Sequence, residues 1–249
     1  MDPSPEAAKQ KIRQRYDQAA GIELTGNGRY ENPTSAKLYF RSRKLQTALR
    51  LGSFQPGDRL LEIGCAVGHF TFPLAQLGYR IIGLDFSENC VAAARQRIPP
   101  KDAAGIRFIQ GDAEDLGLFD DGSFDGVLSL STLRYVPHLS KALKEIHRVL
   151  RPGGRAVLDF PNRWCPWFYL KPWLGSERHP YDHWFMAKDL QKELKKTGLQ
   201  PYAIQRMLFT PTVAPDKLLW IFKGVDWCGE RIPGIKNLAG IIMVGAQKQ

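Results

Sequence analysis

Residues 60–68 read Leu-Leu-Glu-Ile-Gly-Cys-Ala-Val-Gly, and this stretch decides the fold of the chain. Residues 60–63 form a short, mainly apolar run, which is typical of a strand buried on both faces of a parallel sheet. A glycine-rich turn follows over residues 64–68, and residues 69–77 have the composition of a helix that begins directly after it. Glycine allows close backbone approach, and a helix N-terminus offers unpaired N–H groups. A strand, a glycine turn and a helix in this order therefore predict a nucleotide-type pocket at the carboxyl edge of a sheet.

The spacing of the glycine turn distinguishes between kinds of nucleotide. Dinucleotide-binding turns follow the pattern G-x-G-x-x-G, whereas this turn has the form G-x-A-x-G with Glu62 two positions ahead of it. A second apolar run over residues 80–84 ends on Asp85. Asp85 follows Gly64 by about 20 positions, the separation at which an acidic residue meets ribose hydroxyls in such folds. The pattern predicts a nucleoside-containing ligand and argues against an NAD-type oxidoreductase.

Three downstream stretches make the pattern more specific. Residues 62–68 resemble the first motif of class I S-adenosylmethionine-dependent methyltransferases, an acidic residue followed by glycines at alternate positions. The turn after the family's third strand resembles residues 111–114 (Gly-Asp-Ala-Glu). Its fourth strand resembles residues 124–130 (Phe-Asp-Gly-Val-Leu-Ser-Leu), and the entry to its fifth strand resembles residues 148–154 (Arg-Val-Leu-Arg-Pro-Gly-Gly). The resemblance covers residues 55–160 well and is closest to the small-molecule branch that includes the ubiquinone and menaquinone C-methyltransferases. It implies an enzyme whose cofactor is S-adenosyl-L-methionine.

The resemblance also implies which residues bind the cofactor. Asp85 matches the residue that holds the ribose, and Asp112 the one that contacts the adenine amino group. Tyr16 resembles a tyrosine of an N-terminal helix that closes over the cofactor, and Arg43 is a candidate partner for its carboxylate, although a solvated basic face also explains that residue. Alanine stands at position 66 where the family usually has glycine, and we expect it to be tolerated if its φ angle stays negative. The full predicted set is Tyr16, Arg43, Glu62, Gly64, Cys65, Ala66, Gly68, Asp85, Phe86, Asp112, Ala113, Glu114, Ser129 and Leu130.

Each motif also has a purely structural interpretation. Glycines occur in many turns for geometric reasons, and Asp85 could serve as the N-cap of a helix that begins near Ser87. Residues 151–154 (Arg-Pro-Gly-Gly) are an ordinary helix stop. The joint occurrence of these motifs in one order and at the family's spacing favours the cofactor interpretation.

The order of apolar runs, turns and helical patterns predicts the α/β class. With the resemblance it implies a Rossmann-like three-layer sandwich, with a seven-stranded mixed sheet, an antiparallel last strand, an N-terminal helical cap and an insertion after strand five. We expect a single methyltransferase domain over 1–249, divided into a helical cap (1–51), a cofactor-binding core (52–160), an aromatic cover segment (161–185), and a C-terminal helix with the last strands (186–249). Helices are expected over 4–20, 36–51 and 186–197, and the final strands over 200–209 and 239–246.

Composition limits the partners and the location. The net charge is +10, which suits nucleic acid, acidic membranes or anionic substrates, but no nucleic-acid-binding signature occurs and no nucleic-acid partner is expected. The 4 cysteines are scattered without a C-x-x-C pair, so neither a metal site nor a disulfide framework is expected. The first residues lack a secretory pattern and no apolar run approaches about 20 residues, so the expected location is the cytoplasm.

Residues 161–185 carry a dense set of aromatic side chains: Trp164, Trp167, Phe168, Tyr169, Trp173, Tyr181, Trp184 and Phe185. On the carboxyl side of the sheet such a set indicates an apolar acceptor pocket or a cover over it, whereas core packing explains part of the set equally well. Arg163, Lys171 and Arg178 lie among these aromatics. An acceptor with an anionic group, or peripheral contact with an acidic membrane, is therefore a further interpretation.

The acceptor chemistry is constrained mainly by exclusion. Methyl transfer from a sulfonium needs close approach of the acceptor and exclusion of water, and a general base only where the acceptor loses a proton. The candidate bases are His138, His179 and His183, although most histidines are structural. The turn at residues 130–133 (Leu-Ser-Thr-Leu) lacks the Asn/Asp-Pro-Pro-aromatic pattern of base amino-methyltransferases, and no Pro-Cys or Thr-Cys step or carboxylate cluster for other chemistries is found.

We therefore expect in-line methyl transfer to O, N or C of a small, apolar or lipid-like acceptor. The alternative is a non-catalytic, methyltransferase-like binding or scaffold protein, which the alanine at position 66 favours slightly. An NAD-type oxidoreductase is less consistent with the glycine spacing.

Overall fold

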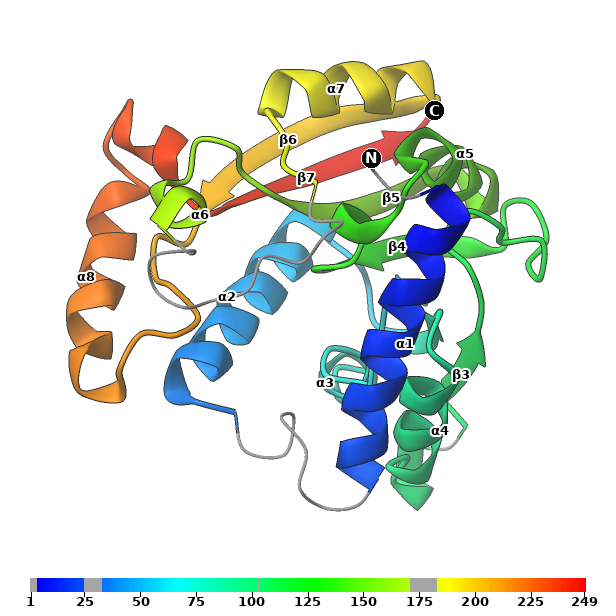
Figure 1. Cartoon of the computed structure of the whole chain (residues 1–249). Coiled ribbons are helices and arrows are strands. Elements are labelled where there is room, and N and C mark those ends of the chain that lie inside the picture. The colour runs from blue at the N-terminus through cyan, green and yellow to red at the C-terminus, as the bar shows by residue number, and fades with distance from the viewer. Residues whose placement is uncertain (1–3, 25–32, 103, 171–182) are drawn as a thin grey trace.

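The structure, a computed structural model, describes residues 4–24, 33–102, 104–170 and 183–249 (Figure 1). Its centre is a seven-stranded sheet in the order β3-β2-β1-β4-β5-β7-β6. The strands are β1 (Arg59–Ile63), β2 (Arg80–Asp85), β3 (Ile106–Gln110), β4 (Phe124–Ser129), β5 (Leu150–Pro161), β6 (Leu199–Met207) and β7 (Ile241–Lys248). Strand β7 runs antiparallel to both β5 and β6, and the pairs from β3 to β5 are parallel. The predicted mixed sheet with an antiparallel last strand is confirmed.

Helices cover both faces of the sheet, so the strands are buried on both sides. Helices α5 (Leu139–Val149) and α7 (Ala187–Lys196) pack on one face, and α2 (Ser35–Gly52), α3 (Thr71–Gln76) and α4 (Glu88–Gln96) on the other. Because side chains alternate along a strand, Leu61 and Ile63 join the core with α5, whereas Leu60 joins the core with α2. This explains the continuous apolar run of residues 60–63 and confirms the three-layer arrangement.

Side chains cap the N-termini of two helices that line or adjoin the site, α2 and α4. Helix α1 (Pro5–Leu24) extends beyond the predicted 4–20, and α2 is capped by the Thr34 side chain, which accepts from the N–H of Lys37. Helix α4 is capped by the Ser87 hydroxyl, which accepts from the N–H of Cys90 at 3.1 Å. Asp85 is therefore not the N-cap that its structural interpretation suggested.

Two elements are not anticipated by the sequence patterns. Helix α6 (Pro166–Leu170) lies in the aromatic segment, and α8 (Leu219–Gly229) with the 3-10 turn η5 (Ile235–Leu238) fills the connection between β6 and β7. In Figure 1, α8 lies beyond α2, on the side of the molecule away from α1 and α4. Residues 171–182, which include Lys171, Trp173, Arg178, His179 and Tyr181, lie outside the described residues.

The chain order creates a crevice at the carboxyl ends of the central strands. From β1 the chain adds β2 and β3 on one side and then crosses to add β4 and β5 on the other. Connections that leave neighbouring strands in opposite directions open a space between them, and ligands of α/β proteins bind there. The glycine turn follows β1 at this point.

Candidate active site

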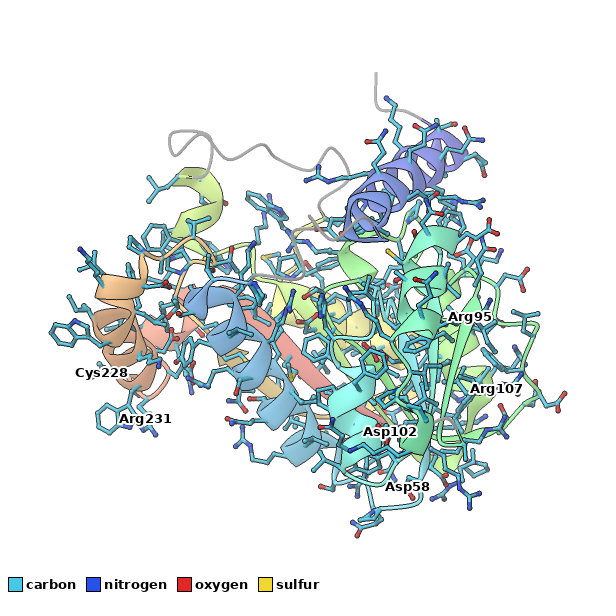
Figure 2. All side chains as sticks on the ribbon, turned by 90° about the horizontal axis from the view of Figure 1, so that it is seen from below. Asp58, Arg95, Asp102, Arg107, Cys228 and Arg231 are labelled. Atoms are coloured by element: carbon cyan, nitrogen blue, oxygen red, sulfur yellow. The ribbon has the colours of Figure 1, made fainter. Side chains whose placement is uncertain are left out.

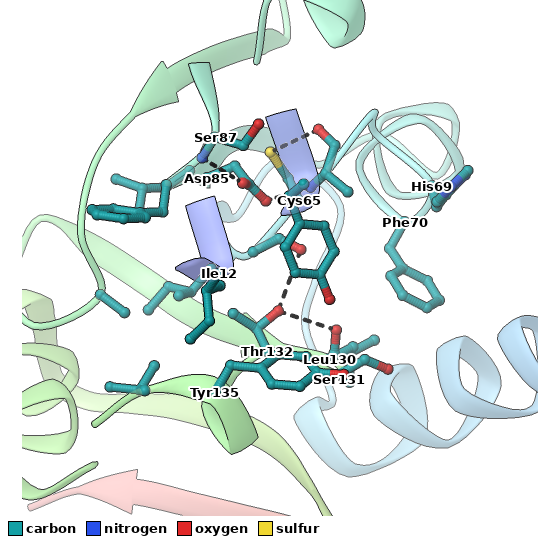
Figure 3. Close-up of a pocket in the computed structure, with 18 of the residues that line it drawn as sticks. Ile12, Cys65, His69, Phe70, Asp85, Ser87, Leu130, Ser131, Thr132 and Tyr135 are labelled. Atoms are coloured by element: carbon teal, nitrogen blue, oxygen red, sulfur yellow. Dashed lines mark hydrogen bonds between the residues drawn. The ribbon is translucent and has the colours of Figure 1, made fainter. Parts of the chain in front are cut away.

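A cavity of about 330 Å³ opens at the carboxyl ends of β1, β2 and β4. Its walls come from the glycine turn, from the residues that follow β2, β3 and β4, and from α1 and α2. In the view of Figure 3, Asp85 and Ser87 lie toward one end of the cavity, Ser131 and Tyr135 toward the other, and His69 and Phe70 at the side. The volume falls in the range of small-molecule sites, about 300–1,000 Å³.

The cavity brings together most of the residues predicted to bind the cofactor. The predicted residues that line it are Tyr16, Gly64, Cys65, Ala66, Asp85, Phe86, Asp112, Ala113 and Leu130. They come from five different parts of the chain, four at the ends of parallel strands and one, Tyr16, on α1.

The glycine turn is shaped by contact between two strand ends. Gly64 has a φ of +80°, and its N–H donates to the carbonyl of Leu84 at 2.7 Å, which ties the turn to β2. A Cβ built on Gly64 would lie 1.8 Å from Oγ1 of Thr132, in the segment that follows β4. Glycine is therefore required by the fold of the turn as well as by its backbone angle.

Ala66 departs from expectation. Its φ is +46°, so the condition under which alanine was expected to be tolerated, a negative φ, is not met. The N–H of Ala66 donates to Oδ2 of Asp85 at 2.8 Å, a charge-assisted bond that holds the turn in the left-handed region. Left-handed backbone costs an L-residue with a Cβ about 1–2 kcal/mol, so this turn stores strain at the cavity wall.

We expect Ala66→Gly to raise the free energy of unfolding by about 1 kcal/mol, because glycine adopts the left-handed conformation without that strain. Urea denaturation measures the change. The matched control is Ala75→Gly in α3, where φ is helical and glycine should destabilise by about 1 kcal/mol. A destabilising effect at position 66 would show that the turn is not strained by its Cβ.

Asp85 links the turn to the start of α4. Its Oδ2 accepts from Ala66, and its Oδ1 accepts from the N–H of Ser87 at 2.9 Å. Burial raises the pKa of Asp85, and the two backbone donors oppose this rise by favouring the ionised form. Asp17 lies close by and accepts from the hydroxyl of Ser87 at 2.5 Å. A carboxylate held in this way keeps further lone pairs for hydroxyl groups of a ligand.

Helix α1 is tied to the turn after β3 by Lys9, which was not predicted from the sequence. Its Nζ lies 2.6 Å from Oδ2 of Asp112 and 2.8 Å from Oε2 of Glu114. The ring of Tyr16 from the same helix lies 6.2 Å from that of Tyr135. These contacts place α1 across the cavity above the residues that follow β3 and β4.

A buried ion pair lies in the cavity wall on the α2 side. Nζ of Lys44 lies 2.5 Å from Oδ2 of Asp159 and 2.5 Å from Oγ of Ser131, and the side chains of Lys44 and Asp159 are only 2% and 1% exposed. Oδ1 of Asp159 accepts from the N–H of Ser131 at 2.5 Å, where φ is +70°. Burial lowers the pKa of Lys44, and Asp159 opposes this effect. The sequence does carry one signal for the burial of Lys44: it lies at helical spacing from Ala36 and Ala48, on the face of α2 that is buried.

His69 lines the cavity, and it too was missed among the candidate bases. Burial and the neighbouring cations Arg41 and Arg97 lower the pKa of His69 to about 3, so the imidazole is neutral at physiological pH. Nδ1 lies 3.2 Å from NH1 of Arg41. Since an arginine can only donate, Nδ1 accepts and the proton sits on Nε2. His69 is thus a polar group at the wall rather than a general base in this state.

The remaining predicted residues are not among those that line the cavity. Glu62 lies beneath the turn, where it accepts from the Thr71 hydroxyl at 2.5 Å and burial raises its pKa to about 7. Arg43 points to Glu230, with 2.7 Å between the charged groups, and to the hydroxyl of Tyr39. The others are the glycine-turn residue Gly68, the buried Glu114 and Ser129, His138 at the start of α5, and the exposed His183. His179 lies outside the described residues.

The described aromatics of the 161–185 segment also lie away from the cavity lining. Trp167 donates from Nε1 to the carbonyl of Phe209 at 2.6 Å, and Phe185 packs on Phe160 with 5.0 Å between ring centroids. Trp164 and Tyr169 are exposed. Among the described residues, the segment thus contributes packing and surface, and the predicted aromatic cover over the site receives no support from them.

Comparison with known proteins gives a consistent result. A family model described as "Methyltransferase domain" matches residues 61–158. A demethylmenaquinone methyltransferase from Symbiobacterium thermophilum is 33% identical over 239 residues, which cover 89% of this chain and 86% of that relative.

Solved structures share the fold at lower identity. Magnesium protoporphyrin IX methyltransferase from Synechocystis PCC 6803, solved with bound S-adenosylmethionine, aligns with a TM-score of 0.64, 18% identity and coverage of 97% of both chains. A [4+2]-cyclase aligns with a TM-score of 0.68, 20% identity and coverage of 96% of both chains. These likenesses show that the whole described chain has one known architecture.

Proposed function

This chain belongs to the class I S-adenosylmethionine-dependent methyltransferase family, and we propose that it methylates a small, apolar aromatic acceptor of the quinol or phenol type. Family membership makes S-adenosyl-L-methionine its cofactor and sets aside both the oxidoreductase and the non-catalytic interpretation. The observation that carries the acceptor class is the apolar part of the cavity lining, which includes Phe40, Phe70, Tyr135 and Val136, and in which the charge of Lys44 is paired with Asp159.

The residues of the cavity fit the cofactor. The carboxylate of Asp85 suits two ribose hydroxyls, which are donors. Apolar side chains such as Phe86, Ala113 and Leu130 suit the faces of an adenine ring, and Asp112 suits its amino group. The guanidinium of Arg41 suits a carboxylate. When bound, S-adenosylmethionine supplies an electrophilic methyl group on a sulfonium.

The residues of the chain contribute to the reaction by positioning the cofactor and the acceptor. Helix α1, tied down by Lys9, and helix α2 exclude water from the cavity, and the rigid turn from Gly64 to Ala66 fixes one end of the cofactor. Proximity and orientation of this kind account for a large share of the barrier reduction in a displacement reaction. Because its pKa is low, His69 does not take the proton that a phenol or quinol must lose. The proposed acceptor therefore binds as its oxyanion, after its hydroxyl proton has gone to solvent.

The similar relative from Symbiobacterium supports the acceptor class, because its name states that it acts on demethylmenaquinone. The apolar wall and the absence of a lining carboxylate cluster among the described residues agree with an acceptor that is held by packing. Lys37 at the wall favours an acceptor that carries an acidic oxygen.

The proposal is tested with S-adenosylmethionine labelled in its methyl group and a panel of acceptors. We expect label in apolar hydroquinones and naphthols, and none in nucleosides or hydrophilic amines. Asp85→Ala should weaken cofactor binding by about 1–3 kcal/mol, whereas Phe40→Gln should raise KM for the acceptor and leave cofactor affinity unchanged. Transfer to a hydrophilic amine or nucleoside, or tight cofactor binding without transfer to any acceptor, would contradict the proposal.

A further inference from the structure

Helix α8 differs from a normal surface helix because it buries an acidic residue and exposes several large apolar side chains. Its inward positions are Leu219, Phe222, Asp226 and Gly229, at the spacing of one helix face, and Asp226 is fully buried. The outward positions include Trp220, Ile221, Val225 and Trp227, with Trp220 and Trp227 exposed by 73% and 60%. The helix thus buries its only acidic side chain and presents its apolar side chains to the outside.

The inward face shows why this arrangement is stable. The carboxylate of Asp226 accepts from the N–H groups of Phe209 and Thr210 at 2.5 and 3.0 Å, and from the Thr210 hydroxyl at 2.6 Å. It therefore satisfies backbone groups at the end of β6. Because Asp226 has this fixed role, the outward orientation of the tryptophans is a consequence of specific bonds rather than of a loosely placed helix.

The apolar surface continues beyond α8. Residues 230–238 lead from α8 through η5 to β7, and Ile232 and Ile235 in this stretch are exposed. We define the α8 surface as Trp220, Ile221, Val225, Trp227, Ile232 and Ile235. On the α8 turn itself, successive residues are about 100° apart, so Cys228 lies between the two tryptophans and the two aliphatic residues. Figure 2 places Cys228 and Arg231 at the outer edge of the molecule.

The charges around the α8 surface have one sign. Lys217, Lys223, Arg231 and Lys236 are all exposed. Of the acidic residues between 208 and 240, Asp226 is buried, Glu230 is paired with Arg43 and only 11% exposed, and Asp216 alone is exposed. The guanidinium of Arg231 lies 4.4 Å from the ring centre of Trp227. Tryptophans flanked by cations match the interface of a bilayer with acidic headgroups, whereas a second copy of the same basic surface would be repelled.

The inward face of α8 packs against the helix that lines the cavity. Leu219 and Phe222 pack with Ala36 and Tyr39 of α2 and with Ala214, and the next turns of α2 carry the cavity residues Lys37, Phe40 and Arg41. Thr212, just before Ala214, also lines the cavity. Within the described part of the chain, no helix is long and apolar enough to span a bilayer.

We infer that the α8 surface docks the protein on anionic phospholipid bilayers, with α8 lying in the plane of the interface and the tryptophans inserted among the headgroups. This site lies outside the cavity and its test does not depend on methyl transfer. It differs from the sequence-based expectation, which placed membrane contact in residues 161–185.

The natural Cys228 provides the probe, because it is the exposed member of the four cysteines. An environment-sensitive fluorophore on Cys228 should brighten and shift to the blue with vesicles of phosphatidylglycerol and phosphatidylcholine, and not with phosphatidylcholine alone. Co-sedimentation of the unlabelled protein should show the same preference and weaken as salt rises. Trp220→Glu with Trp227→Glu should lower vesicle affinity at least about tenfold, and each of Lys223→Gln and Arg231→Gln should lower it roughly fivefold.

The matched control is Leu118→Glu, an equally exposed leucine (64%) far from α8 in the loop between β3 and β4. This variant should bind vesicles as the unchanged protein does, and all variants should keep their circular dichroism spectra and cofactor affinity. Failure of the unchanged protein to bind anionic vesicles, or equal loss in Leu118→Glu, would overturn the inference. A dimer in sedimentation velocity that Trp220→Glu with Trp227→Glu dissolves would instead make the surface an interface between copies.

Discussion

Gly64→Val is expected to weaken S-adenosylmethionine binding at least 100-fold. Two effects combine at this position. A β-branched residue at a φ of +80° is a steric outlier, and its Cβ would lie 1.8 Å from Oγ1 of Thr132. Either the turn or the segment after β4 must shift, and both form the cavity wall. Positive φ alone costs on the order of 1–3 kcal/mol, and the clash adds to it. Isothermal titration with the cofactor measures the loss.

Gly57→Val separates the two causes. Gly57 has a φ of +93°, and nothing lies within 4 Å of a Cβ built there, so this variant carries the backbone strain without the clash. It should lose stability and keep cofactor affinity. The clash itself is tested by Gly64→Ala with and without Thr132→Gly, since removing the threonine side chain should restore part of the binding. Full affinity in folded Gly64→Val would place the cofactor elsewhere.

The physical reason for the glycine requirement could not be derived from the sequence. The pattern of residues 60–68 indicated close ligand approach, and it identified the correct residue. The structure shows that a Cβ at position 64 first meets Thr132, which is 68 residues away in the chain. Local patterns predict that a glycine is needed, while the neighbour that excludes a side chain is a property of the folded chain.

The sheet was predictable because its signals are local. Each central strand is a short apolar run that ends in a turn residue, and a parallel strand buried on both faces needs no more than that. Asp85 and Asp112 follow strand ends, so their convergence on one cavity follows from the parallel sheet. The division of the chain at residues 51, 160 and 185 stays a prediction.

The elements that were missed lack such local signals. In α8 large apolar residues lie on both faces and Asp226 faces inward, so the sequence has no amphipathic pattern that would identify its buried face. Lys44 shares the inward stripe of α2 with Ala36 and Ala48, but its partner Asp159 lies in β5, and no local pattern links the two residues. His69 follows the glycine turn, and the local pattern predicts the turn but not the role of the next side chain in the cavity wall.

Lys44→Met should lower the free energy of unfolding by about 3–5 kcal/mol, because the carboxylate of Asp159 would then be buried without its cation. The side chains of both residues are almost fully inaccessible, and their charged atoms lie 2.5 Å apart. Urea denaturation followed by circular dichroism measures the change. Lys37→Met on the same helix is the control, and its effect should stay within about 0.5 kcal/mol because Lys37 is more exposed. Equal effects at the two positions would show that the ion pair is not formed.

The double variant Lys44→Met with Asp159→Asn decides whether charge or packing causes the loss. Asparagine keeps an oxygen that can accept from the N–H of Ser131 and removes the buried charge, so the double variant should recover at least half of the lost stability. It should also bind the cofactor normally, because the pair contacts Ser131, which lies toward the end of the cavity opposite Asp85 (Figure 3). A raised KM for the acceptor with unchanged cofactor affinity would then assign the ion pair to the acceptor end of the cavity. Equal loss of cofactor affinity would show that the two ends are not separable.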